Sequence, residues 1–156
     1  MLSRQYVAGF FDGEGCVNIT VRGKVRQVCL RVMIVNTDAS ILQKINLSYG
    51  GRLTKPHSAK DGWKLTRQLV FMGAEAFNFL ISIYPYLEIK KRQAKLAIDF
   101  WNFQSSGRNQ RCEFVSRPIP KMPGRMVLKR TPQTVERELQ FKAEMHELNR
   151  KGMPIQ

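Results

Sequence analysis

The sequence predicts an α+β fold in which helices cover one face of an antiparallel sheet. Apolar residues recur at helical spacing in several segments, and two other stretches show the apolar and polar alternation of half-buried strands. These segments follow one another as helix, hairpin, helix, hairpin and further helices. A chain of 156 residues is long enough to bury one hydrophobic core, so we expect a single compact domain with an appendage at most.

The first third of the chain predicts a helix followed by a hairpin. Ser3 is a good N-cap, and Gly13 and Gly15 are expected to end the helix that it starts. Strands are expected over 16–22 and 27–34, with a turn at 22–25. The predicted inward residues are Val17, Ile19, Val21, Val28, Leu30, Val32 and Ile34.

The middle of the chain repeats this order. The cap-type residues at 36–38 predict a helix that ends near Tyr49, and segments 51–56 and 62–72 predict a second hairpin. The face assignment of that hairpin stays open, because Arg67 shares its parity with Trp63, Leu65, Leu69 and Phe71. Helices are then expected over 73–84 and, after the break at Pro85, over 87–103.

The last third is predicted to be a basic appendage to a core of residues 1–103. Prolines and glycines among basic residues at 104–131 predict a linker or extended arm. Thr131 and Pro132 are the N-cap and first residue of a final helix, which packs on the body or on a partner. We therefore divide the chain into a core, 1–103, and a basic arm with a C-terminal helix, 104–156.

Charge points to a polyanionic partner. The formal net charge is +14 and the pI is about 10.2, with the excess spread over both parts of the chain. We expect no membrane partner, because no apolar run approaches the length of a spanning helix, and the N-terminus lacks the pattern of a signal peptide. Polar side chains on the outward face of the sheet suit contacts to bases and phosphates, although a plain solvated face is equally compatible with the alternation: Asn18, Thr20, Arg22, Gln27, Arg31 and Arg52.

The sequence contains no motif that indicates several other kinds of site. The three cysteines are widely spaced, which indicates neither a disulfide framework nor a zinc cluster. The two histidines, His57 and His146, lie far apart in sequence, and no Walker loop or Ser-His-Asp set can be assembled.

The segment Val7–Gly15, VAGFFDGEG, resembles the motif that names the LAGLIDADG family of homing endonucleases. It matches at Ala8, Gly9, Asp12 and Gly15, with Gly13 within the usual alternative. Segments 34–38 and 85–94 resemble later parts of the family pattern, so the resemblance covers roughly residues 3–103. It implies the αββαββα fold, with a saddle-shaped four-stranded antiparallel sheet in each subunit and, here, a C-terminal extension that ends in a helix.

The resemblance also implies a dimer and a metal site. The small residues Ala8, Gly9 and Gly13 allow two such helices to approach closely, and Asp12 completes the expected dimer interface. Glu14 stands where the family has its metal-binding carboxylate, more often an aspartate, and the Gly13 carbonyl is a further candidate ligand for Mg²⁺ (or Mn²⁺). Asp12 is expected to hydrogen-bond to nearby backbone or to the partner helix and not to bind metal.

Two more residues have implied catalytic roles, each beside a plainer interpretation. Lys90 matches a basic residue that polarises the scissile phosphate or orders the attacking water, but it also fits a surface lysine. Asn36 matches a polar residue that orients solvent, but it also fits a helix cap.

The implied function is metal-dependent cleavage of double-stranded DNA by a homodimer at a long, near-palindromic site. The sheet would lie over the major groove, with Arg67 added to the six polar residues of the outward face. Two alternatives remain open: an RNA-binding maturase that assists intron splicing, and a catalytically silent DNA-binding regulator. An intracellular location is expected, in a bacterial or phage-host cytoplasm or in an organelle.

Overall fold

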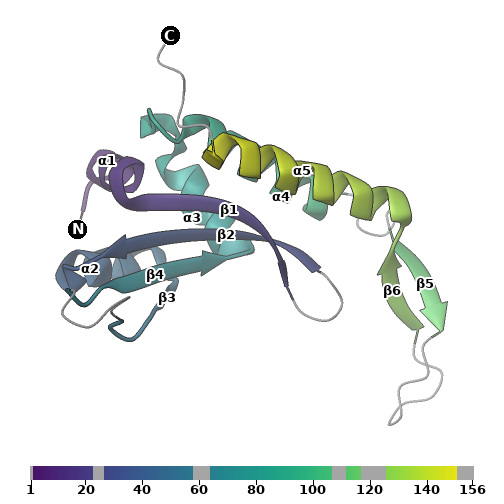
Figure 1. Ribbon diagram of the computed structural model, residues 1–156, viewed down its shortest axis with the longest axis horizontal. Coiled ribbons are helices and arrows are strands. Elements are labelled where there is room, and N and C mark those ends of the chain that lie inside the picture. The colour runs from purple at the N-terminus through teal and green to yellow at the C-terminus, as the bar shows by residue number, and fades with distance from the viewer. Residues whose placement is uncertain (1, 23–26, 58–63, 107–111, 117–125, 151–156) are drawn as a thin grey trace.

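The computed structural model describes residues 2–22, 27–57, 64–106, 112–116 and 126–150 (Figure 1). The first hairpin turn, part of the second hairpin loop and Trp63 lie outside these ranges. The predicted α+β order is confirmed. The elements are α1 (Arg4–Glu14), β1 (Gly15–Arg22), β2 (Gln27–Asn36), α2 (Ala39–Tyr49), β3 (Arg52–Leu53), β4 (Arg67–Met72), α3 (Ala74–Ile83), the 3-10 helix η1 (Tyr84–Tyr86), α4 (Lys91–Ser105), β5 (Cys112–Ser116), β6 (Met126–Arg130) and α5 (Pro132–Arg150).

Four strands form one antiparallel sheet in the order β1-β2-β4-β3. Strand β1 is therefore an edge strand, and it pairs with β2 over its full length, from Gly15 opposite Ile34 to Arg22 opposite Gln27. The predicted inward residues of β2 and of most of β1 are buried, whereas Val21 is only partly buried. In Figure 1, α3 and α4 lie behind the sheet, and α5 runs along its β1 edge.

Phe79 of α3 lies at the centre of the core and joins three elements. Its ring stacks on Phe71 of β4 at a centroid distance of 4.4 Å and makes edge contacts with Phe11 of α1 and Tyr49 of α2, both at 5.4 Å. Such aromatic contacts add directional stabilisation to the burial of apolar area. The motif helix is therefore fixed to the sheet through its inner face.

Three parts of the structure differ from the prediction. The strands of the second hairpin are shorter than expected, with β3 limited to Arg52–Leu53 and β4 beginning at Arg67. Helix α4 begins at Lys91, about four residues later than expected, because the backbone N–H groups of Glu88 and Lys90 bond to the Asp12 carboxylate. The arm over 104–131 contains the hairpin β5–β6, in which Cys112 pairs with Arg130. The prolines that suggested an irregular arm fall between these two strands in the sequence.

Helix α5 begins as predicted. The Thr131 hydroxyl accepts from the N–H of Thr134, as an N-cap should. Phe141 packs against Phe100 and Phe103 of α4, at centroid distances of 5.6 and 5.7 Å. The helix is therefore joined to the body by apolar contacts.

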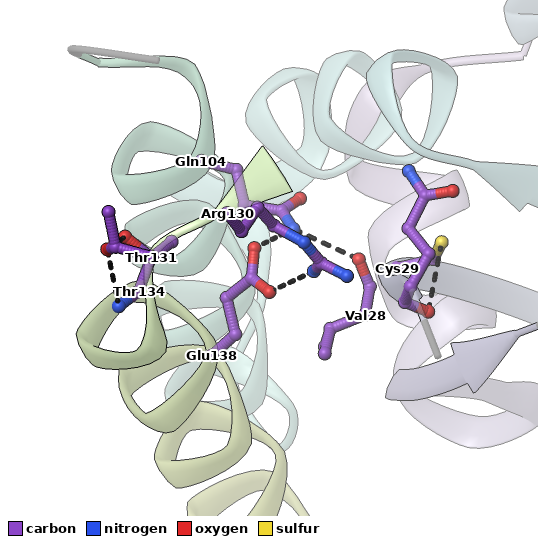
Figure 2. Close-up of polar contacts among 8 residues, drawn as sticks. Val28, Cys29, Gln104, Arg130, Thr131, Thr134 and Glu138 are labelled. Carbon is purple, nitrogen blue, oxygen red and sulfur yellow. Dashed lines mark hydrogen bonds and ion pairs between the residues drawn. The ribbon is translucent and has the colours of Figure 1, made fainter. Parts of the chain in front are cut away.

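A polar network also fastens α5 to the body (Figure 2). The Glu138 carboxylate, almost fully buried, accepts hydrogen bonds from Arg130 at the end of β6 and from the side chain of Gln104 on α4. Gln104 also donates to the backbone carbonyl of Val28 in β2, at 3.0 Å. One carboxylate thus links β6, α4, α5 and, through Gln104, the sheet. Among the described helices, none combines the length and apolarity needed to cross a membrane.

Candidate active site

The C-terminal end of α1 is held by its own acidic residue, Asp12. This carboxylate accepts from the backbone N–H of Glu88 at 2.8 Å and of Lys90 at 2.9 Å, and its residue is only 8% exposed. The expected bonding of Asp12 to backbone is therefore present. A chain segment 76 residues away in sequence is fixed against the motif helix.

Lys90 is brought to the same place. Its ammonium group donates to the backbone carbonyl of Asp12, one of the last carbonyls of the helix. A cation is favourable there because the C-terminus of a helix carries partial negative charge. Two of the predicted catalytic residues, Lys90 and Glu14, therefore lie at one end of α1.

Glu14 is exposed and is the last residue of α1, and Gly13 before it is also exposed. The chain then passes directly into β1 at Gly15. A Cβ at position 15 would lie 2.2 Å from a ring carbon of Phe11, so a larger residue could not make this close turn. The oxygen atoms of Glu14 and the Gly13 carbonyl are of the hard type that Mg²⁺ prefers. Within the described residues, no three His, Cys, Asp or Glu side chains gather as a cluster.

Asn36 is the last residue of β2. It lies two residues beyond Ile34, which pairs with Gly15 of β1, so the strand register places Asn36 level with the end of α1. Its side-chain oxygen accepts from the N–H of Asp38 at 2.8 Å. Asp38 in turn caps α2, and hydrogen bonds from the Ser40 hydroxyl and N–H hold the pKa of Asp38 below its ordinary value. The hydrogen bond of Asn36 thus fixes the turn before α2, whose N-cap is Asp38.

The open face of the sheet collects four of the predicted DNA contacts. Residues opposite one another in a ladder point to the same face, and Asn18 lies opposite Arg31 in β2. Thr20 and Arg52 belong to the same face, because Thr20 is two residues from Asn18, and Arg52 lies opposite Val70. A pocket on this sheet is lined by Thr20, Val21, Arg31, Arg52, Val70, Met72 and Glu75.

The other three candidates lie at the ends of their strands. Arg67 lies opposite Asn36 and shares the parity of the buried Leu69 and Phe71, so its position belongs to the helix-covered side of the sheet. The register with β2 therefore decides which residues of β4 face the helices, a question that the sequence left open. Gln27 is exposed and pairs with Arg22 at the far end of the first hairpin, and of Arg22 only the backbone is described.

The outer face of α1 is open. A Cβ added at Gly9 or Gly13 would meet no atom of the described residues within 4 Å. Tyr6 is 51% exposed and stacks on the partly buried Phe10, with ring centroids 6.4 Å apart. Ala8 and Asp12, the other two residues of the predicted interface, are buried within the subunit itself.

Sequence reasoning missed one side chain of this region, Asn149 in the last turn of α5. Its amide nitrogen donates to the Val17 carbonyl and to the side-chain oxygen of Asn18, at 2.9 and 3.1 Å. The contact spans 131 residues of sequence and leaves no local pattern. The hydrogen bond from Asn18 to Cys16 Sγ, at 3.0 Å, was also not predicted.

Residues 7–107 match the family model of the LAGLIDADG endonucleases, and the chain belongs to this family. The match includes the motif helix from Val7 onward, the whole four-stranded sheet and α4. No curated protein sequence matches the chain significantly.

Solved structures with the same fold are distant in sequence. The homing endonuclease I-CvuI, in complex with its target in the presence of Ca, is 19% identical with a TM-score of 0.67, covering 93% of this chain and 80% of its own. The archaeal intron-encoded I-Vdi141I, complexed with DNA, is 17% identical with a TM-score of 0.67, covering 98% and 87%. I-SmaMI, bound to uncleaved DNA with calcium ions, is 16% identical with a TM-score of 0.65, covering 94% of this chain but 46% of its own.

Proposed function

We propose that this protein is a homodimeric, metal-dependent endonuclease that cuts both strands of a long, near-palindromic DNA site. The observation that carries the proposal is the exposed carboxylate of Glu14 at the junction of three features. The open face of α1 precedes Glu14, Lys90 contacts the same end of that helix, and β1 follows Glu14 in the chain. The outward side chains of β1 begin the polar face of the sheet. Membership of an endonuclease family supports cleavage as the reaction.

The dimer is proposed to form through the outer face of α1. Glycine inside a helix lowers stability by about 1 kcal/mol relative to alanine, and nothing in the described residues requires Gly9 to be small. A second α1 packed closely against this face would require small residues at Gly9 and Gly13, and it would also cover Tyr6 and Phe10. The match to just under half of I-SmaMI supports the idea that one chain of this length supplies half of an assembly.

A two-fold axis beside α1 would bring both copies of Glu14 to the same place, next to the scissile phosphates of opposite strands. Glu14 and the Gly13 carbonyl would hold Mg²⁺ or Mn²⁺, which when bound stabilises negative charge on phosphate and lowers the pKa of bound water. The proposed role of Lys90 is to place positive charge beside the phosphate, and that of Asn36 is to orient solvent.

DNA is proposed to lie along the open face of the sheet. Asn18, Thr20, Arg31 and Arg52 supply donors and acceptors that can read base edges, and Gln27 and Arg22 extend this row toward the tip of the hairpin. Arg67 is proposed as a contact from the end of β4, outside the row. I-CvuI in complex with its target and I-Vdi141I complexed with DNA support the choice of nucleic acid. The net charge of +14 predicts affinity that falls steeply with salt.

The decisive experiment compares Glu14→Gln with Glu136→Gln, an equally isosteric change at an exposed carboxylate on α5. Each purified protein is incubated with Mg²⁺ and a randomised pool of DNA duplexes, and the cut ends are sequenced. The wild type and Glu136→Gln should yield paired cuts at one near-palindromic site. Glu14→Gln should bind that site with similar affinity without cutting it.

Three outcomes would contradict the proposal. Cutting by Glu14→Gln at the wild-type rate would remove Glu14 from the active site. Tight binding of DNA without any strand scission would favour a silent regulator, and tight binding of structured RNA without scission would favour a maturase.

A further inference from the structure

The last turn of α5 reaches the edge of the sheet where the proposed DNA face begins. Asn149 donates both to the carbonyl of Val17 at 2.9 Å and to Asn18 Oδ1 at 3.1 Å. Asn18 lies on β1, four residues after Glu14. A side chain from the C-terminal extension therefore contacts a predicted base-reading residue directly.

These contacts fix the orientation of both amides. A backbone carbonyl can only accept, so the Asn149 atom beside Val17 must be its nitrogen. That nitrogen is a donor, so the Asn18 atom next to it must be the oxygen. The Asn18 nitrogen then lies on the other side of its amide, where it donates to Cys16 Sγ at 3.0 Å.

The two contacts leave part of the Asn18 amide available. A primary amide has two N–H donors and two acceptor positions on its oxygen, and Asn18 uses one of each within the protein. One donor and one acceptor have no partner among the residues that the structure describes. An asparagine with a free donor and acceptor pairs with the N7 and N6–H₂ of adenine in the major groove.

The position of Asn18 also suits recognition of a single base. Outward side chains along a strand are about 6.6 Å apart, roughly twice the 3.4 Å rise of one base pair. Successive outward residues of β1 therefore advance by about two base pairs, so each can read its own position. Cys16, Asn18 and Thr20 form such a series from the end of α1.

We propose that Asn149 is a positioning residue for sequence recognition: it holds the Asn18 amide in the orientation that reads one adenine in each half-site. This inference rests on the proposed DNA-binding function. It goes further by making the C-terminal helix part of the specificity of the sheet. Other residues at the end of α5, such as the neighbouring Arg150 with its 72% exposed side chain, would contact phosphate and carry no base preference.

The first test measures base preference. Wild type, Asn18→Ala, Asn149→Ala, the double variant and Arg150→Ala are each incubated with a randomised duplex library without Mg²⁺, and the bound fraction is sequenced. Asn18→Ala should reduce the adenine preference at one position of each half-site by about tenfold. Asn149→Ala should reduce it by a smaller factor at that position and no other, and the double variant should match Asn18→Ala. Arg150→Ala, the control, should weaken all sequences alike.

A second test needs no DNA. In the free protein, the side-chain amide resonances of Asn18, assigned by their loss in Asn18→Ala, should shift and exchange faster with solvent in Asn149→Ala. Unchanged resonances would overturn the positioning role whatever the protein binds. Shifted resonances with an unchanged base preference, or a loss of affinity equal over all sequences, would overturn the role in specificity and leave DNA binding standing. If the wild type selects no sequence, the proposed function fails, and this inference with it.

Discussion

Replacing Arg130 by methionine tests whether the buried ion pair fastens the C-terminal helix to the body. The side chain of Glu138 is only 3% exposed, and without Arg130 its charge would face apolar surroundings, with the amide of Gln104 still donating to it. Removing one partner of a buried pair lowers stability by about 3–5 kcal/mol. For a chain of this size, that corresponds to a decrease in Tm of roughly 6–20 °C.

Replacing Glu138, the other member of the pair, should lower stability less than Arg130→Met does. In Glu138→Leu the charge left behind belongs to Arg130, whose side chain is 23% exposed and can turn toward water. We expect a loss of about 1–3 kcal/mol, the range for a partly buried polar group that loses one hydrogen-bond partner. The double variant, which exchanges the whole pair for apolar groups, should be more stable than Arg130→Met alone.

Urea denaturation followed by circular dichroism gives the free energy of unfolding of each variant. Lys95→Met is the matched control, because the ion pair of Lys95 with Asp99 lies at the surface, with side chains 63% and 46% exposed, and its loss should have a far smaller effect. If the double variant is as unstable as the two single losses added together, the residues are not coupled. Arg130 and Glu138 would then not act as a pair in holding α5 to the body.

Three further substitutions test other parts of the structure. Gly9→Leu should leave the fold intact, because the added side chain meets nothing within 4 Å of its Cβ among the described residues, but it should convert a dimer into monomers in analytical ultracentrifugation; a dimer that persists would move the interface elsewhere. Asp12→Ala should lower the free energy of unfolding by about 2–6 kcal/mol, since the N–H groups of Glu88 and Lys90 would each lose their acceptor; a loss near zero in urea denaturation would contradict this. Because the pKa of Asp38 is lowered in the folded state, its contribution to stability is present above the ordinary carboxyl pKa and disappears as the pH falls through the folded value. The difference in stability between wild type and Asp38→Asn should therefore be largest above about pH 4 and vanish in stronger acid, and a constant difference would refute the assignment.

Local patterns were sufficient to predict the part of the fold that holds the motif. Ser3, the apolar inner face of α1 and the alternation in β1 and β2 are properties of neighbouring residues, and each was found where it was expected. Glu14 could be placed at the end of α1 for the same reason. Local periodicity and capping are strongest where one face of an element is buried.

Contacts between distant segments could not be predicted in this way. The late start of α4 depends on Asp12, which lies 76 residues before the first N–H that it accepts. The contact of Asn149 with Asn18 spans 131 residues. The face of Arg67 was ambiguous, because apolar and basic residues shared one parity until the register with β2 was known. In each case the missing information was a pairing in space.

The two acidic residues of the motif illustrate why the helix can serve both the fold and the site. Asp12 and Glu14 are two residues apart, so a period of 3.6 residues per turn directs them to nearly opposite sides of α1. Asp12 is buried and uses its acceptors on the backbone N–H groups of Glu88 and Lys90, which brings the lysine to the end of the helix. Glu14 is exposed, and its carboxylate is the proposed metal ligand. The same short segment therefore separates a structural carboxylate from the carboxylate proposed to bind metal, and exchanging their positions would require rotating the helix against its own core.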